Sequence, residues 1–153
     1  MKCVLGVFIR QPELVREAIA RAVCDQIRTC DYLHPTMFAT PVVEELAAAL
    51  CDRAPTGIER FYFLSGGGEA NEAAIKLARK YFKDKGQPER FTIISMQQSF
   101  HGRTMATLSA TGQDKIKKGF DPVLGGFSFV PFNDIDALKS AIDEHTCAVM
   151  LEP

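Results

Sequence analysis

The sequence predicts an α/β fold, with a mostly parallel β-sheet flanked by helices. Short apolar runs bounded by turn residues, such as RFYFL at 60–64 and RFTIIS at 90–95, are typical of strands buried on both faces of a sheet. The longer stretches between these runs place apolar residues three and four positions apart, which is the spacing of an amphipathic helix. Alternation of the two patterns along 153 residues predicts right-handed β–α–β crossovers within a single domain.

Two helices are expected before the first strand, at residues 12–29 and 41–53. The second of these should begin at Thr40-Pro41, because threonine is a common N-cap and proline fits the first turn of a helix. A third helix is expected at residues 69–85, where acidic residues open an apolar stripe and basic residues close it, as the helix dipole favours. A loop and a helix are expected next, at residues 100–112. The last helix is expected at residues 134–143, after a further strand.

Four strands are expected, each from an apolar run between turn residues. They cover residues 60–64, 90–95, 125–132 and 148–151. In open α/β sheets, ligands bind just beyond the carboxyl ends of the strands. Functional residues are therefore expected directly after these runs.

The composition gives no reason to expect nucleic acid or a membrane as a partner. The formal net charge is -1, and no apolar run is long enough to cross a bilayer. The five cysteines form no CxxC pair and have no metal-ligand spacing, so no metal site is expected. Reduced thiols in a cytoplasmic protein are the simplest interpretation of these cysteines.

Three consecutive glycines, Gly66, Gly67 and Gly68, stand between the expected first strand and a long helix. The amides at a helix N-terminus and the positive end of its dipole favour an anion, and glycines allow a phosphate to approach the backbone closely. The run is neither a Walker A loop nor a GxGxxG fingerprint. A tight turn without any ligand explains the spacing equally well at this point.

Longer motifs around these glycines resemble the class III (ornithine/acetylornithine/ω-type) aminotransferases. The stretch SGGGEANEAAIKLAR is similar to the family's phosphate-binding signature, and SFHGRTMATLSATG to its aromatic-His-Gly element. AVMLEP is similar to the strand that ends in Glu-Pro, and ATPVVEELAAAL to the helix before the phosphate loop. The motifs occur in the family's order and cover most of the chain. The resemblance implies pyridoxal 5′-phosphate (PLP) as cofactor and part of the large domain of a fold-type-I PLP-dependent transferase.

The resemblance also implies roles for five residues. The amides of Gly67 and Gly68 would bind the PLP phosphate, and Phe100 would lie on one face of the pyridine ring. His101 would sit beside the ring, and Glu152 would be a polar group of the pocket at a strand end. The alternatives are a plain core phenylalanine, a buried hydrogen-bonded histidine and a solvated carboxylate.

Two departures from the family pattern qualify the resemblance, at Gly68 and at residues 8–12, and Gly102 has a further implied role. Gly68 stands where the family usually has serine or threonine, so a hydroxyl donor to the phosphate is lost. Gly102 is expected to leave room beneath the stacked aromatic ring. The stretch FIRQP at residues 8–12 lacks both histidines of the family's Gly-His-x-His-Pro element.

In the family, the lysine that carries the cofactor aldehyde and the carboxylate that pairs with the pyridine nitrogen follow the Glu-Pro strand. We therefore expect no catalytic residue within these 153 residues. Residues 1–153 are expected to form a single partial domain, without the amino-terminal arm, the catalytic-lysine region and the carboxy-terminal small domain.

The activity that the resemblance implies is transfer of an amino group from an amino acid or ω-amine to a 2-oxo acid through PLP. Residues 32–40 resemble a segment that meets the neighbouring subunit, which implies a homodimer. A non-catalytic module that binds a phosphate-bearing ligand or a partner chain is the alternative.

Overall fold

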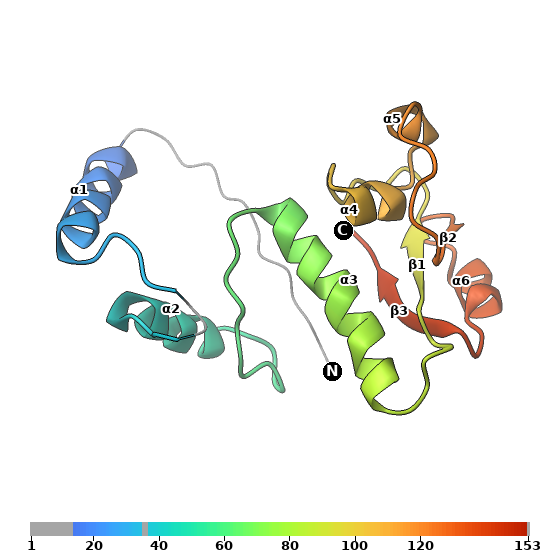
Figure 1. Ribbon diagram of the computed structural model, residues 1–153, viewed down its shortest axis with the longest axis horizontal. Helices are drawn as coiled ribbons and strands as arrows, with labels where there is room; N and C mark the ends of the chain where they lie inside the picture. Colours follow the sequence, from blue (N-terminus) through green and yellow to red (C-terminus); the bar gives the residue numbers. More distant parts are fainter. Residues whose placement is uncertain (1–13, 35–36, 153) are drawn as a thin grey trace. The chain divides into compact units, whose positions relative to one another are not determined.

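The computed structural model describes residues 14–34 and 37–152, and its chain divides into two compact units (Figure 1). Unit 1 comprises Met1–Tyr62 and unit 2 comprises Phe63–Pro153. The stretch FIRQP at residues 8–12 lies outside the described residues.

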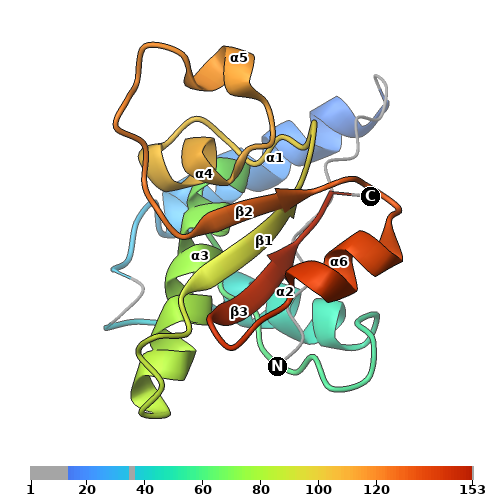
Figure 2. The same ribbon diagram turned by 90° about the vertical axis from the view of Figure 1, so that its right-hand side faces the viewer.

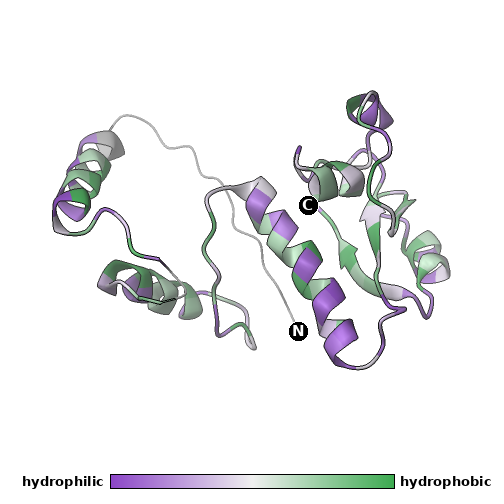
Figure 3. Cartoon of the chain, viewed as in Figure 1, coloured by the Kyte–Doolittle hydropathy of each residue, from purple (hydrophilic) through white to green (hydrophobic). Residues whose placement is uncertain are grey.

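Unit 1 contains the two helices that the sequence predicts, α1 (Leu14–Thr29) and α2 (Pro41–Cys51). Thr40 is the N-cap of α2 and Pro41 its first residue, as expected. Helix α2 is apolar over most of its length (Figure 3), yet it has no buried residue. Val42, Val43 and Leu46 are each more than two-fifths exposed. Unit 1 therefore presents an apolar surface on α2.

Unit 2 is an α/β unit built on three parallel strands in the order β2–β1–β3. Helices α3 and α4 cover one face of this sheet and α6 covers the other (Figure 2). The predicted α/β class with a parallel sheet is confirmed. Its elements are α3 (Gly67–Asp84), β1 (Thr92–Met96), α4 (Met105–Ala110), α5 (Asp114–Lys117), β2 (Phe127–Val130), α6 (Ile135–Ala141) and β3 (Thr146–Met150).

The central strand β1 is buried on both faces, as its continuous apolar run predicts. Ile93 packs with Ile75 of α3 and with α4, whereas the next residue, Ile94, packs with Val130 and α6. Successive side chains of a strand point to opposite faces, so one short run supplies two separate core clusters. This burial anchors the carboxyl end of β1, where the candidate site begins.

The predicted strand at residues 60–64 is wrong. The structure has no strand there, and Tyr62 is 76% exposed, with Phe63 and Leu64 also exposed. A continuous apolar run does not by itself establish a strand, because a strand also needs a neighbour with which to form a ladder. The described sheet consists of β1, β2 and β3, and this run is not part of it.

Helix α3 begins two residues earlier than predicted, at Gly67 instead of Glu69. Gly66 is the N-cap, with φ of -167°, and its carbonyl accepts a bond from the Ala70 amide at 2.9 Å. Gly67 and Gly68 are therefore the first two helical residues, not a loop before the helix. Their amides belong to the set at a helix start that has no partner within the helix.

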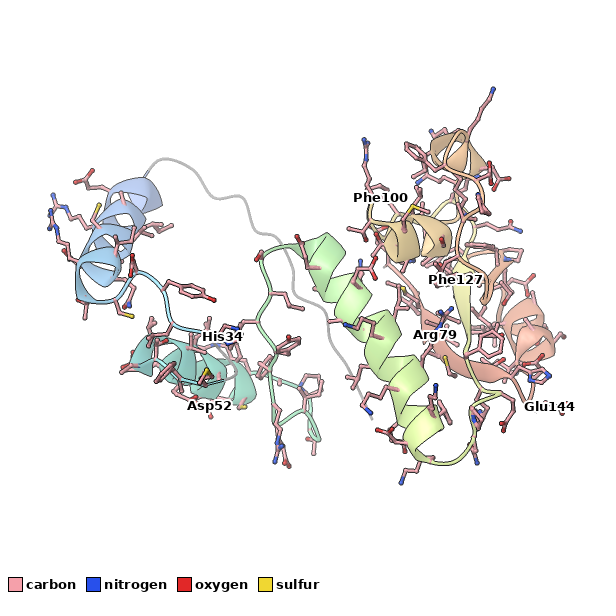
Figure 4. All side chains as sticks on the ribbon, in the orientation of Figure 1. His34, Asp52, Arg79, Phe100, Phe127 and Glu144 are labelled. Atoms are coloured by element: carbon pink, nitrogen blue, oxygen red, sulfur yellow. The ribbon has the colours of Figure 1, made fainter. Side chains whose placement is uncertain are left out.

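Arg79 joins α3 to the amino ends of two strands. Its guanidinium donates to the carbonyl oxygens of Phe91 and Gly125 at 3.1 and 2.9 Å. The same group lies 5.2 Å from the ring centroid of Phe127, and Figure 4 shows the two side chains next to each other. Because α3 is held at this end of the sheet, its N-terminus is directed toward the opposite, carboxyl end.

Candidate cofactor site

The carboxyl ends of β1 and β3 bring two of the predicted site residues together. After β1 the chain turns and leads to Phe100, and β3 is followed closely by Glu152. The Phe100 amide donates to Oε2 of Glu152 at 3.1 Å. These two residues are 52 positions apart in sequence, and the parallel sheet is what makes them neighbours.

The glycine turn at the start of α3 is open on one side. Neither Gly67 nor Gly68 has a positive φ, and a Cβ built at either position meets nothing within 4 Å. Backbone conformation and internal crowding therefore do not explain why these positions lack side chains. The N-cap, Gly66, has no side chain that could bond to the free amides. This turn can accept an approaching anion.

Gly102 connects the turn to the segment that carries Phe100. Its φ is +136°, which an L side chain rarely adopts, and a Cβ there would lie 2.5 Å from Oγ1 of Thr107 and 3.3 Å from Cα of Gly68. The missing side chain thus makes room for Thr107 and for the start of α3, not for an aromatic ring above it. This proximity of Gly102 to Gly68 brings the start of α3 close to the segment that carries Phe100.

His101 is buried and hydrogen-bonded, which is the alternative that the sequence left open. It is 5% exposed, and its Nε2 lies 3.0 Å from Oγ of Ser95. Its amide donates to Oγ1 of Thr111 at 2.9 Å. Burial lowers the pKa of His101 below the ordinary 6.5, and the nearby Glu152 carboxylate partly opposes this shift. The lowered pKa favours the neutral form of the ring.

Phe100 is not a plain core phenylalanine. Its side chain is 43% exposed although the backbone on either side is hydrogen-bonded, and Figure 4 shows it beside α4. An exposed aromatic face on a rigid backbone can stack against a flat heterocycle. Glu152 is exposed, as the solvated alternative predicts, but it is also a partner of the Phe100 amide.

A carboxylate lies near the start of α3. Oε2 of Glu69 lies 3.0 Å from the position that a Cβ of Gly66 would occupy. The negative charge of Glu69 disfavours an anion beside Gly66, whereas the positions of Gly67 and Gly68 are open.

Sequence reasoning missed the polar residues that hold this site together. Ser95 and Thr111 are both fully buried and bond to His101, and Asn71 and Glu72 bond to the segment after Phe100. One signal was available, because Asn71 and Glu72 interrupt the alanine-rich start of α3 within the quoted motif. Among the described residues, no cluster of three potential metal ligands occurs, and no helix is apolar over the length that a membrane span requires.

Comparison with known proteins assigns the chain to a family. The family model described as Aminotransferase class-III matches residues 15–153. The chain belongs to the class-III aminotransferases. It is 43% identical to the acetylornithine aminotransferase of Myxococcus xanthus over 99% of this chain, and 52% identical to that of Halalkalibacterium halodurans over 76% of it. The chain spans 35% and 28% of the length of these two relatives.

Solved structures of transaminases have the same fold. A transaminase from the marine bacterium Virgibacillus superposes with a TM-score of 0.86 at 28% identity, over 90% of this chain and 34% of that one. An (S)-enantioselective omega-transaminase from Thermomicrobium roseum gives a TM-score of 0.80 at 35% identity, over 88% of this chain and 35% of that one. The four described cysteines, Cys24, Cys30, Cys51 and Cys147, are free thiols, and Cys3 lies outside the described residues.

Proposed function

We propose that this class-III aminotransferase chain supplies the phosphate and ring contacts of a PLP site. The protein of which it is part would transfer an amino group from an amino acid or ω-amine to a 2-oxo acid. The observation that carries the proposal is the open glycine turn. Gly67 and Gly68 expose helix-terminal amides, and a Cβ at either position would meet no atom of the described residues within 4 Å. Gly68 also lies close to Gly102, in the segment that follows Phe100.

The residues present fit PLP. The amides of Gly67 and Gly68 would hold its phosphate at the positive end of the α3 dipole. The exposed face of Phe100 would pack on its ring, and Glu152 would hold the Phe100 backbone in place through the bond to its amide. His101 would lie beside the cofactor ring as a neutral side chain, held in place by its hydrogen bond to Ser95. When bound, PLP supplies an electron sink for the amino group's carbon.

The exposed apolar surface of α2 supports a homodimer. A row of half-exposed apolar side chains on a helix is unfavourable in water and is typical of an interface. Exposed Tyr32 and Phe38 continue the apolar character within the segment that resembles a subunit contact. The free thiols are in keeping with a cytoplasmic location.

The proposed phosphate cradle, formed by the amides of Gly67 and Gly68, is tested by PLP binding. The full-length protein of which this chain is part is compared as wild type, Gly67→Val and Gly68→Ser. The affinity is read from the absorbance of the bound cofactor. Valine at 67 should block the phosphate while leaving the fold intact, because a Cβ at this position meets no other atom of the described residues within 4 Å. Serine at 68 adds a hydroxyl donor to a charged acceptor, which is worth about 1.5–3 kcal/mol, or about tenfold or more in affinity.

The same proteins should be assayed for amino transfer from acetylornithine to a 2-oxo acid, because the relatives carry the name acetylornithine aminotransferase. If Gly67→Val binds PLP as tightly as wild type, the glycines form only a turn and the cradle is wrong. PLP binding without any amino transfer would instead favour a non-catalytic module.

A further inference from the structure

Two consecutive side chains of α3, Asn71 and Glu72, reach across to the segment that follows Phe100. Nδ2 of Asn71 donates to the His101 carbonyl oxygen at 2.6 Å. Oε1 of Glu72 accepts from Oγ1 of Thr104 at 2.5 Å and from the Ala106 amide at 3.1 Å. These partners are 30 to 34 positions away in sequence, so the bonds join separate parts of the fold.

The bonds begin one turn after the glycines that start α3. The backbone of Gly102 also lies close to Gly68, because a Cβ built on Gly102 would be 3.3 Å from Cα of Gly68. The segment from His101 to Ala106 is therefore held to the first turns of α3 by two side chains and one backbone contact. These contacts hold the segment that directly follows Phe100 close to the start of α3.

Glu72 also stabilises α4, which begins at Met105. Its carboxylate accepts from the amide of the second residue of α4, where a negative charge is favourable to the helix dipole. Thr104 and Thr107 form a capping box at the same end. Helix α4 has this capping box in addition to the bond from Glu72. The bond from Glu72 therefore also connects the start of α4 to α3.

We propose that Asn71 and Glu72 are positioning residues of the cofactor site, which keep the Phe100 segment at the spacing that one PLP molecule requires. This inference rests on the proposed function. A ligand that touches both the amide cradle and the aromatic face depends on that spacing. A ligand that touches the cradle alone does not.

The test compares the binding of two ligands, PLP and inorganic phosphate, to the full-length protein of which this chain is part. PLP binding is followed by absorbance, and phosphate binding by phosphorus NMR. The variants are Asn71→Ala, Glu72→Ala and Glu72→Gln, and the control is Asp84→Asn, which removes an exposed carboxylate from the far end of the same helix. Far-UV circular dichroism and melting temperature report whether each variant folds.

Asn71→Ala and Glu72→Ala should each weaken PLP about tenfold, since each loses strong hydrogen bonds, while phosphate affinity stays within about twofold of wild type. Glu72→Gln keeps an acceptor oxygen at the same place and should recover most of the PLP affinity. Asp84→Asn should bind both ligands as wild type does.

Equal losses for PLP and phosphate, or unchanged PLP affinity in both alanine variants, would overturn the proposal. Failure of all three variants to fold would also overturn it, because the pair would then serve stability alone. If the wild-type protein binds neither PLP nor phosphate, the proposed function itself is wrong. This result differs from those that overturn only the positioning role of Asn71 and Glu72.

Discussion

Replacing Gly102 with alanine should destabilise unit 2 through two separate effects. The first is conformational, because φ is +136° and a side chain there is strained whatever the space around it. The second is steric, because the new methyl group would lie 2.5 Å from Oγ1 and 2.9 Å from Cβ of Thr107. Thr107 is fully buried and bonded to Thr104, so it has little freedom to move away.

The two effects have similar magnitudes. A non-glycine residue in a sparsely populated backbone region costs about 1–3 kcal/mol. Forcing a methyl group into a packed site costs about 1–3 kcal/mol more. Gly102→Ala should therefore lower the free energy of unfolding by about 2–6 kcal/mol, against a total of about 5–15 kcal/mol for an ordinary domain.

Gly119→Ala is the matched control, because Gly119 has φ of +91° with nothing within 4 Å of its Cβ position. It carries the conformational cost alone, about 1–3 kcal/mol. The free energy of unfolding is measured by urea titration followed by far-UV circular dichroism. If Gly102→Ala loses no more stability than Gly119→Ala, the close packing of Gly102 against Thr107 and Gly68 is wrong.

The pKa of His101, the Ser95 hydrogen bond and the exposed face of α2 each give a further prediction. Burial lowers the pKa of His101, so the unfolded chain binds a proton at this side chain at a higher pH than the folded protein does. The free energy of unfolding should therefore decrease as the pH drops below about 6.5, and it should decrease less in His101→Gln. An NMR titration of the folded protein should place the His101 midpoint below 6.5. Ser95→Ala leaves Nε2 of His101 unpaired and should cost about 1–3 kcal/mol in urea unfolding, whereas exposed Ser140→Ala should change stability by no more than about 0.5 kcal/mol. Leu46→Lys should weaken self-association in sedimentation velocity, and an unchanged association constant would remove α2 from the interface.

Much of the fold could be predicted because its patterns are local. Helix spacing located α1, α2, α3 and α6 to within a few residues, and three apolar runs located β1, β2 and β3. The fourth run, at residues 60–64, failed, since it has the same apolar character but no place in the described sheet. The short helix α5 (Asp114–Lys117) had no apolar pattern to reveal it.

The candidate site was predicted in its parts but not in its connections. The motifs selected the glycines, Phe100, His101 and Glu152, but no pattern indicated that His101 would turn inward to Ser95. Nor did a pattern indicate that Gly102 would contact Gly68 across 34 positions of sequence. Such contacts depend on how several helices and strands pack together. The pattern of residues within one short stretch of sequence does not indicate this packing.

The sequence by itself determined most element types and the parallel α/β class, because helical hydrogen bonds and apolar periodicity are properties of neighbouring residues. Its motifs determined the family. Only the tertiary structure decided which elements became strands of the sheet and which polar groups met. Strand ladders and bonds such as Asn71 to His101 join residues far apart in the chain. Their geometry is set by packing of α3, α4 and α6 on the sheet, where Ile93 and Ile94 bury opposite faces of one strand.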